Sequence, residues 1–333
     1  MGGGIVGIKI CHNIFREIIS LENLFLAWDE FRRGKKNRKD VQEFGFNLED
    51  NIFQLYQELK NQTYKHSKYQ SFYIQDPKLR HIHKATVRDR IVHHLVSWFL
   101  EQIYDKSFII DSYSCRIKKG THKAIKRLNK FSFPISKNNT KGFYALKCDI
   151  KRFFDNIDHK ILIDILKKRI EDKDFLWLIS EIINSFYSGD KNQGIPLGNL
   201  TSQYFANIYL NELDKFVKHK LKIKYYIRYT DDFVILNENK DYLKKIINLI
   251  REFLRDNLKL SLHPNKIIIR THHQGIDFLG YVTLPYCRVL RTKTKKRMFK
   301  RINQNNIQSY LGVLSHCDSH KLKQKLNGII EIW

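Results

Sequence analysis

The stretch YYIRYTDDFVILNE, residues 225–238, holds two adjacent aspartates, Asp231 and Asp232, between two apolar runs rich in β-branched and aromatic residues. Such runs are typical of buried strands, so the segment predicts a β-hairpin with both acids at its turn. Two carboxylates held this close repel each other in a low dielectric unless a cation joins them. A divalent ion such as Mg²⁺, which prefers hard oxygen ligands, would complete the arrangement.

A third acid ends a similar strand. Asp149 closes the apolar segment YALKCD, residues 144–149, immediately before an expected turn. If this strand joins the hairpin in one antiparallel sheet, three carboxylates meet in a basic protein. Such a set can hold two Mg²⁺ ions, one to activate an attacking hydroxyl and one to stabilise a leaving pyrophosphate. An ordinary turn residue remains the alternative interpretation of Asp149.

The net charge is +26, from 60 Lys and Arg residues against 34 Asp and Glu residues. Two dense basic runs, RRGKKNRK at 32–39 and RTKTKKRMFKR at 291–301, add to this excess. A charge of this size predicts an acidic partner, with nucleic acid first and a membrane surface second.

The five cysteines are scattered and form no CxxC pair, which fits a reducing cytoplasm better than a disulfide framework. The chain opens without a basic start or cleavage pattern, and no apolar run reaches transmembrane length. We therefore expect a cytoplasmic protein with no membrane partner.

The middle of the chain reads as strand, helix, loop, helix, hairpin, helix and strand, which predicts an α+β fold with an antiparallel sheet. A second hairpin is expected over 68–85, where the sequence alternates around one Asp-Pro pair. Helices are expected at 12–30, 48–60, 88–104, 158–170, 174–187, 200–220 and 241–256, and in the last forty residues.

At this level of detail the sequence resembles reverse transcriptases. RYTDDFVIL resembles their Tyr-x-Asp-Asp box, and LKCDIKRFFDNID resembles the box that supplies their first catalytic aspartate. GIPLGNLTSQYFANIYLNELD is similar to their nucleotide-pocket loop and the helix after it, and DPKLRHIHKATVRDRIVHHLV to their fingers. LSLHPNK and DFLGY stand where the family has a palm lysine and the primer grip. The six boxes follow the family's order over roughly residues 20 to 285.

The resemblance implies a right-hand polymerase with an antiparallel-sheet palm, mostly helical fingers and a short helical thumb. We expect the N-terminal region and fingers, with part of the palm, at 1–140. The palm would follow at 141–285 and a short basic thumb at 286–333. The implied partners are a template RNA, a cDNA or primer strand and deoxynucleoside triphosphates. The implied cofactor is two Mg²⁺ ions, with Mn²⁺ as a substitute.

The resemblance also implies a role for individual residues. Asp149, Asp231 and Asp232 match the catalytic metal ligands. Lys78 and Arg80 match the fingers cations that bind the triphosphate, and Phe154 matches the bulky residue that excludes a 2′-hydroxyl. The remaining matches are Lys266 near the pyrophosphate, Leu197, Gly198 and Gln203 in the nucleotide pocket, and Phe278, Leu279, Gly280 and Tyr281 in the primer grip.

One sequence difference from most reverse transcriptases points to a smaller group within that family. Most relatives have Gln-Gly-x-x-x-Ser-Pro in the pocket loop, whereas residues 197–203 read LGNLTSQ. Leu197 cannot form the hydrogen bond that glutamine makes. Its loss would weaken the selection of the correct incoming nucleotide by roughly 1 kcal/mol. This variant resembles the enzymes of diversity-generating retroelements, which copy a template-repeat RNA with errors at adenines. Members of that group work with a small, basic, oligomeric accessory protein.

Three alternatives stay open. A group II intron-type reverse transcriptase shares ANIYLNELD and FLGY, but usually carries a maturase region that we do not expect here. A retron or phage-defence reverse transcriptase is another, although no Val-Thr-Gly triplet follows the primer grip. The non-enzymatic alternative is an RNA-binding protein on a polymerase scaffold, against which the three aspartates argue.

Overall fold

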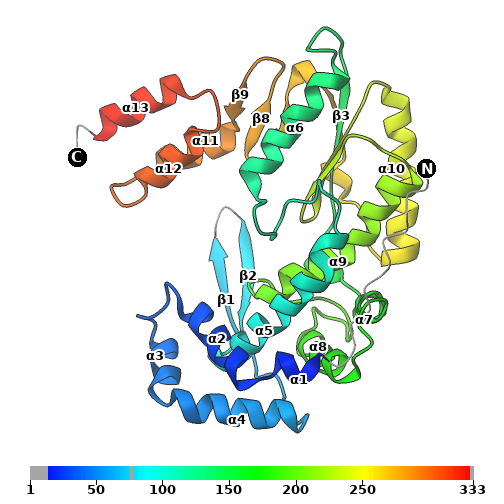
Figure 1. Cartoon of the computed structure of the whole chain (residues 1–333). Coiled ribbons are helices and arrows are strands. Elements are labelled where there is room, and N and C mark those ends of the chain that lie inside the picture. The colour runs from blue at the N-terminus through cyan, green and yellow to red at the C-terminus, as the bar shows by residue number, and fades with distance from the viewer. Residues whose placement is uncertain (1–13, 76–77, 331–333) are drawn as a thin grey trace. The chain divides into compact units, whose positions relative to one another are not determined.

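The structure is a computed structural model that describes residues 14–75 and 78–330. The chain divides into two compact units, and each is assembled from segments that are distant in sequence. We describe each unit by itself (Figure 1).

The first unit combines the described residues of Met1–Ile109 with Arg152–Asp214 and Leu254–Leu260. Its helices are α1 (Phe15–Ile18), α2 (Leu21–Arg32), α3 (Lys39–Phe46), α4 (Leu48–Lys60), α5 (Val87–Tyr104), α7 (His159–Lys167), α8 (Lys173–Asn184) and α9 (Leu200–Lys215). Helix α5 is buried along most of its length, and α1, α2 and α3 pack against it. It begins where the Thr86 side chain accepts a hydrogen bond from the Asp89 amide, as an N-cap residue should.

A two-stranded antiparallel sheet completes the first unit. Strands β1 (Gln70–Gln75) and β2 (Leu79–Lys84) pair in the register Gln70↔Lys84 through Gln75↔Leu79. This confirms the hairpin predicted over 68–85, although Asp76 and Pro77 of its turn lie outside the described residues. The side chains of β1 are exposed, so burial of one face of the strand contributes little to the stability of this hairpin.

The second unit combines Ile110–Lys151, Lys215–Phe253 and the described residues of Ser261–Trp333. Its main sheet has the strand order β4-β5-β3-β6, and every neighbouring pair is antiparallel. The strands are β3 (Tyr144–Asp149), β4 (Tyr226–Tyr229), β5 (Asp232–Asn237) and β6 (Ile268–Thr271). Helix α6 (Thr121–Ile135) packs on β4 and β5, with Leu128 and Phe131 in one buried cluster with Ile227 and Val234 (Figure 1).

A smaller sheet and the C-terminal helices form the rest of this unit. Strands β7 (Ile276–Phe278), β8 (Tyr281–Thr283) and β9 (Arg288–Leu290) pair in that order. They are followed by α11 (Thr292–Arg301), α12 (Ile307–Leu314) and α13 (His320–Ile330). Met298, Leu314 and Leu326 bring one apolar residue from each helix into a shared buried cluster. Among the described residues, no helix is long and apolar enough to span a membrane.

Two expectations about helices were wrong in detail. The region predicted as one helix over 12–30 breaks before α2, because Ser20 accepts a hydrogen bond from the Asn23 amide and caps a new helix. The helix predicted over 200–220 changes to a π-helical turn at Phe216–Lys220. Its C-terminal end widens, so the α-helical spacing of the sequence does not continue to residue 220.

Candidate active site

The main sheet of the second unit brings the three predicted aspartates to one end. Asp149 on β3 and Asp232 on β5 are direct partners in the antiparallel register. Residues so paired point to the same face, with Cα atoms about 4.5–5.5 Å apart. Asp231 directly precedes Asp232 in the turn between β4 and β5. Strand pairing, and not sequence proximity, therefore makes this cluster.

Burial and mutual repulsion shape the charge of the cluster. Asp149 is buried, and Asp231 and Asp232 are half-buried. Burial, followed by the negative charges of Asp149 and Asp232, raises the pKa of Asp231 to about 6. Burial also raises the pKa of Asp232, against a lowering effect of Lys147. The negative charge of the cluster is therefore only partly neutralised by its surroundings. A divalent cation bound there would reduce the repulsion between the carboxylates.

Two lysines stand beside the acids. Lys266 Nζ lies 2.6 Å from Asp149 Oδ2, and Lys147 Nζ lies 3.9 Å from Asp232 Oδ1. Lys266 was predicted from the sequence, and the structure adds its contact with Asp149. Lys147 was missed, although it lies two residues before Asp149 in β3 and so shares its face of the sheet.

The carboxylate oxygens of the three aspartates are suitable magnesium ligands, but the three side chains are not arranged as a metal site. Among residues 14–75 and 78–330, no three His, Cys, Asp or Glu side chains are grouped closely enough to hold a metal ion. Asp149 instead accepts its hydrogen bond from Lys266. Carboxylate oxygens are nevertheless the ligands Mg²⁺ prefers, and the raised pKa of Asp231 reflects crowding that such an ion would offset. The residues therefore fit the ion in the chemistry of their oxygen atoms.

A buried arginine holds the turn that carries Asp231. Arg228 is fully buried, and its guanidinium donates to the Thr230 carbonyl at 3.0 Å and to Ser112 Oγ at 3.1 Å. Thr230 has a φ of +52°, which is uncommon for a β-branched residue, and its Oγ1 donates to Ser114 Oγ at 2.7 Å. These bonds offset a strained backbone conformation next to the cluster. Sequence reasoning missed Arg228, although an arginine inside the apolar run YYIRY was a signal.

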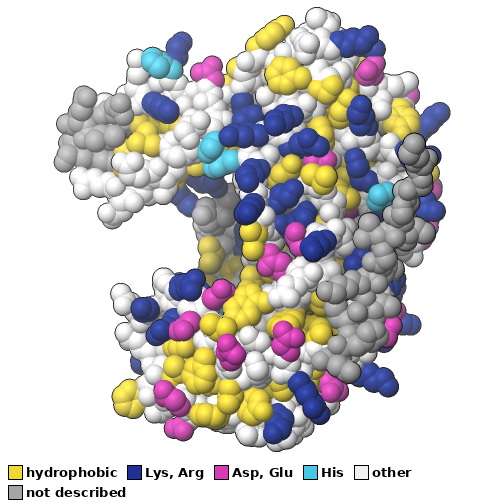
Figure 2. Space-filling view, viewed as in Figure 1, with side chains coloured by type: hydrophobic (Ala, Val, Ile, Leu, Met, Phe, Trp, Pro, Cys, Tyr) yellow, Lys and Arg dark blue, Asp and Glu magenta, His cyan; other side chains and the backbone are white. Residues whose placement is uncertain are grey.

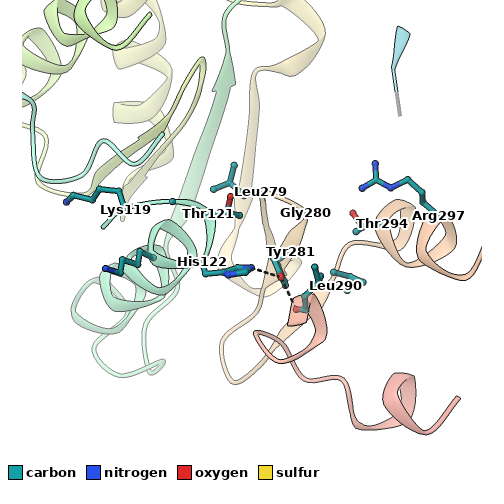
Figure 3. Close-up of a pocket in the computed structure, with 12 residues that line it drawn as sticks. Lys119, Thr121, His122, Leu279, Gly280, Tyr281, Leu290, Thr294 and Arg297 are labelled. Atoms are coloured by element: carbon teal, nitrogen blue, oxygen red, sulfur yellow. Dashed lines mark hydrogen bonds between the residues drawn. The ribbon is translucent and has the colours of Figure 1, made fainter. Parts of the chain in front are cut away.

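The four predicted primer-grip residues form a tight turn between β7 and β8. Phe278 and Tyr281 pair across it, and both are buried. Leu279 and Gly280 have φ values of +51° and +89°, as a type I′ two-residue turn requires. The Tyr281 hydroxyl donates to the Val313 carbonyl at 2.9 Å, which ties the turn to α12 (Figure 3).

This turn lines a pocket of about 630 Å³ within the second unit. The first turn of α6 forms another wall, with Thr121 and His122, and α11 contributes Thr294 and Arg297 (Figure 3). Lys and Arg side chains gather over α6 and its flanking loop (Figure 2). The sequence places Lys118, Lys119, Lys123, Lys126, Arg127 and Lys130 in this segment, and Lys119 and Lys123 line the pocket. A pocket and surface of this charge suit a nucleic-acid backbone.

The first unit holds the predicted nucleotide-pocket residues. The Leu197 carbonyl accepts from the His83 amide at 3.1 Å, and Asn199 Nδ2 donates to the His83 carbonyl at 3.0 Å. The loop is thus fixed against β2. Gly198 has a φ of +107°, which favours glycine, and a Cβ there would lie close to the Ile82 side chain, 3.0 Å from its Cγ2 atom.

Three other predicted residues lie in the same unit. Phe154 is half-buried, and its carbonyl accepts from the Ile195 amide at 2.9 Å, which joins it to the start of the pocket loop. Lys78 and Arg80 are exposed near the turn of the β1–β2 hairpin, and Gln203 is exposed on α9. The roles of all these residues stay predictions.

The chain is similar to a known protein family and to intron-encoded proteins. The family model described as reverse transcriptase (RNA-dependent DNA polymerase) matches residues 64–283. The chain is 26% identical to the group II intron-encoded protein LtrA of Lactococcus lactis subsp. cremoris, over 88% of this chain and 59% of that protein. It is 24% identical to the putative COX1/OXI3 intron 2 protein of Saccharomyces cerevisiae, over 72% of this chain and 34% of that protein. The chain thus spans between about a third and three fifths of the length of these two relatives.

A solved structure shows the fold. The structure of apo telomerase from Candida tropicalis, truncated from the C-terminal domain, superposes with a TM-score of 0.52 at 14% identity. The likeness covers 70% of this chain and 58% of that one. It confirms the predicted α+β right-hand polymerase fold with an antiparallel-sheet palm.

Proposed function

The chain belongs to the reverse transcriptase (RNA-dependent DNA polymerase) family, and we propose that it copies RNA into DNA with Asp149, Asp231 and Asp232 as its catalytic residues. The observation that supports this most is the register of β3 and β5, which makes Asp149 and Asp232 direct partners beside Asp231. In this proposal the N-terminal region and fingers, with part of the palm, occupy 1–140, the palm 141–285 and the thumb 286–333.

The cofactor is two Mg²⁺ ions, for which Mn²⁺ substitutes, held by the three aspartates. Bound there, they would lower the pKa of the primer 3′-hydroxyl and stabilise the leaving pyrophosphate. Lys266 balances the charge of Asp149, and in this proposal its ammonium group also binds a pyrophosphate oxygen. The Leu279–Gly280 turn positions the primer strand, and the basic pocket beside it binds the backbone phosphates.

The deoxynucleotide contacts are proposed for the first unit. Lys78 and Arg80 bind the triphosphate, for which a fork-shaped guanidinium is well suited. Phe154 excludes a 2′-hydroxyl by its bulk. Leu197, Gly198 and Gln203 line the pocket for the base and sugar, and the bonds of this loop to His83 fix its backbone.

Primer extension with purified protein, Mg²⁺ and an RNA template tests this function. We expect Asp231→Asn to abolish synthesis while RNA binding stays intact, because the change removes a metal ligand and adds no positive charge. Asp241→Asn is the matched control, since Asp241 is an exposed residue of α10 (Lys240–Leu258) paired with Lys244. EDTA should stop synthesis and Mn²⁺ should restore it. Synthesis by the Asp231→Asn protein would overturn the assignment.

We further propose that the enzyme belongs to the diversity-generating type and makes errors opposite template adenine. The residues that support this are LGNLTSQ at 197–203, where an apolar side chain replaces a hydrogen-bonding one. The partners would be a template-repeat RNA and a small, basic, oligomeric accessory protein in the cytoplasm. Sequencing the cDNA tests the proposal, and an even error spectrum across the four template bases would count against it.

A group II intron-type function is the second candidate. The match to LtrA, which runs over 88% of this chain, favours it. The two candidates predict different products, because an intron enzyme should copy adenine as faithfully as the other bases. The same sequencing experiment therefore separates them.

A further inference from the structure

Lys147 lies inside the main sheet of the second unit, next to the aspartates that the proposed function assigns to the metal ions. It belongs to β3, which pairs with β5 on one side and with β6 on the other. Lys147 and Asp149 are two residues apart in this strand, so their side chains share one face of the sheet. Asp232, the partner of Asp149 in the register, lies on the same face. A cation is therefore built into the acidic end of the sheet.

The surroundings of Lys147 restrict the position of its ammonium group. The side chain is 18% exposed and lines a small cavity of about 50 Å³. The apolar lining of this cavity comes from Ala145, Ile268 and Ile276. Asp277, the acid in the same lining, accepts a hydrogen bond from Arg291 Nε at 2.6 Å. Among the residues that the structure describes, the carboxylate oxygen nearest to Lys147 Nζ is Asp232 Oδ1, at 3.9 Å.

Lys266, the other lysine of the cluster, is freer to move. It ends a short 3₁₀ turn, η4 (Pro264–Lys266), and its side chain is 35% exposed. It can rotate away from Asp149, toward solvent or toward the pyrophosphate oxygen that the proposed function assigns to it. Lys147 instead lies in a central strand, with a neighbouring strand on each side. Of these two cations, Lys147 is therefore the one that stays beside the carboxylates.

The charge of Lys147 acts against a metal ion at the same carboxylates. A cation that stabilises the ionised form of Asp232 also repels any second cation that binds to that carboxylate. Affinity for hard divalent ions rises with the number of negative charges among the ligands. A fixed ammonium group near the ligands has the opposite effect, because it cancels part of that negative charge.

We propose that Lys147 is a fixed counter-cation that lowers the affinity of the cluster of Asp149, Asp231 and Asp232 for divalent ions. The ammonium group balances Asp232 while no ion is bound, and it opposes the ion that replaces it. The protein then holds its metal ions weakly until a triphosphate adds its own negative charge. The inference rests on the proposed function, because it takes these three aspartates as the metal ligands.

Titration of the purified full chain with Mn²⁺, followed by the EPR signal of the free ion, tests the proposal without nucleotide and without synthesis. We expect Lys147→Met, which keeps the length of the side chain and removes its charge, to bind Mn²⁺ about ten-fold more tightly than the unsubstituted protein. Lys147→Gln should change the affinity in the same direction. Lys147→Arg keeps the charge and should bind Mn²⁺ as the unsubstituted protein does. Subtracting the binding that remains in Asp231→Asn corrects for ions bound elsewhere.

Lys141→Met is the matched control. Lys141 lies just before the opposite end of β3, its side chain is half exposed, and it pairs with Glu238. The change removes the same charge from the chain away from the aspartates, so the affinity for Mn²⁺ should not change. Urea unfolding of each variant measures the structural contribution of the lysine separately. A purely structural role of Lys147 would move the unfolding midpoint and leave the affinity for Mn²⁺ as it was.

Equal affinity for Mn²⁺ in Lys147→Met and in the unsubstituted protein would overturn the inference. Weaker binding in Lys147→Met would also overturn it, because Lys147 would then support Asp232 as a ligand. If neither protein shows binding that depends on Asp231, the proposed metal site is wrong and the inference fails with it. Tighter Asp231-dependent binding in Lys147→Met, in a protein that makes no DNA, would count against the proposed reaction alone.

Discussion

Leu197→Gln should lower the error frequency opposite template adenine by about five-fold. The structure limits the change to the side chain, because the Leu197 carbonyl is held by the His83 amide and Asn199 holds the His83 carbonyl. Leu197 is half-buried, so the variant should keep its stability to within about 0.5 kcal/mol. What it gains is one polar contact to the nucleotide, worth roughly 1 kcal/mol, which corresponds to that five-fold factor.

The assay is deep sequencing of cDNA made on one defined RNA, with errors counted separately for each template base. Leu197→Met is the control, since methionine keeps the apolar character and about the same volume. An unchanged error frequency in an active Leu197→Gln enzyme would refute the argument. An equal fall with methionine would also refute it, because packing and not hydrogen bonding would then set fidelity.

Three further predictions concern stability. Arg228→Met should destabilise the protein by about 2–4 kcal/mol in urea unfolding, because it removes charged hydrogen bonds to Thr230 and Ser112. An unchanged unfolding midpoint would show that the turn is stable without these hydrogen bonds. Tyr281→Phe should cost about 1 kcal/mol and speed proteolysis within α12, since it breaks the bond to the Val313 carbonyl; unchanged cleavage would contradict this. The folded state keeps His93 neutral down to about pH 3, whereas the unfolded chain binds that proton near pH 6.5. Stability should therefore fall below pH 6.5 by about 1.4 kcal/mol per pH unit from this residue, and the slope measured by urea unfolding should be smaller by that amount in His93→Phe.

The sequence predicted those structural features that depend on residues close to one another in the chain. The hairpin at 225–238 and the strand ending at Asp149 could be recognised from their apolar runs and from the acidic residues at their ends. A helix was predicted to begin at residue 158, and the Asp158 carboxylate accepts a hydrogen bond from the Ile161 amide at the start of α7. In each case the residues that decide the structure are neighbours in the chain.

What the sequence did not reveal depends on contacts across long separations. Lys147 reaches Asp232 only because β3 pairs with β5, and Arg228 binds Ser112 from a segment more distant still. The chain of hydrogen bonds from Ser67 through His66 to His93 requires a loop and helix α5 to meet. A single arginine or histidine has no periodicity, so the sequence does not show which distant residue it contacts.

The position of β3 in the middle of its sheet has a consequence for biosynthesis. When residues 144–149 leave the ribosome, neither partner strand exists yet, because 232–237 and 268–271 are translated later. Both hydrogen-bonding edges of this apolar segment stay open during that interval, which makes it a site for chaperone capture or misassociation. A ribosome stalled before residue 268 would hold a nascent chain whose sheet cannot close, and solubility should improve sharply once that point is passed.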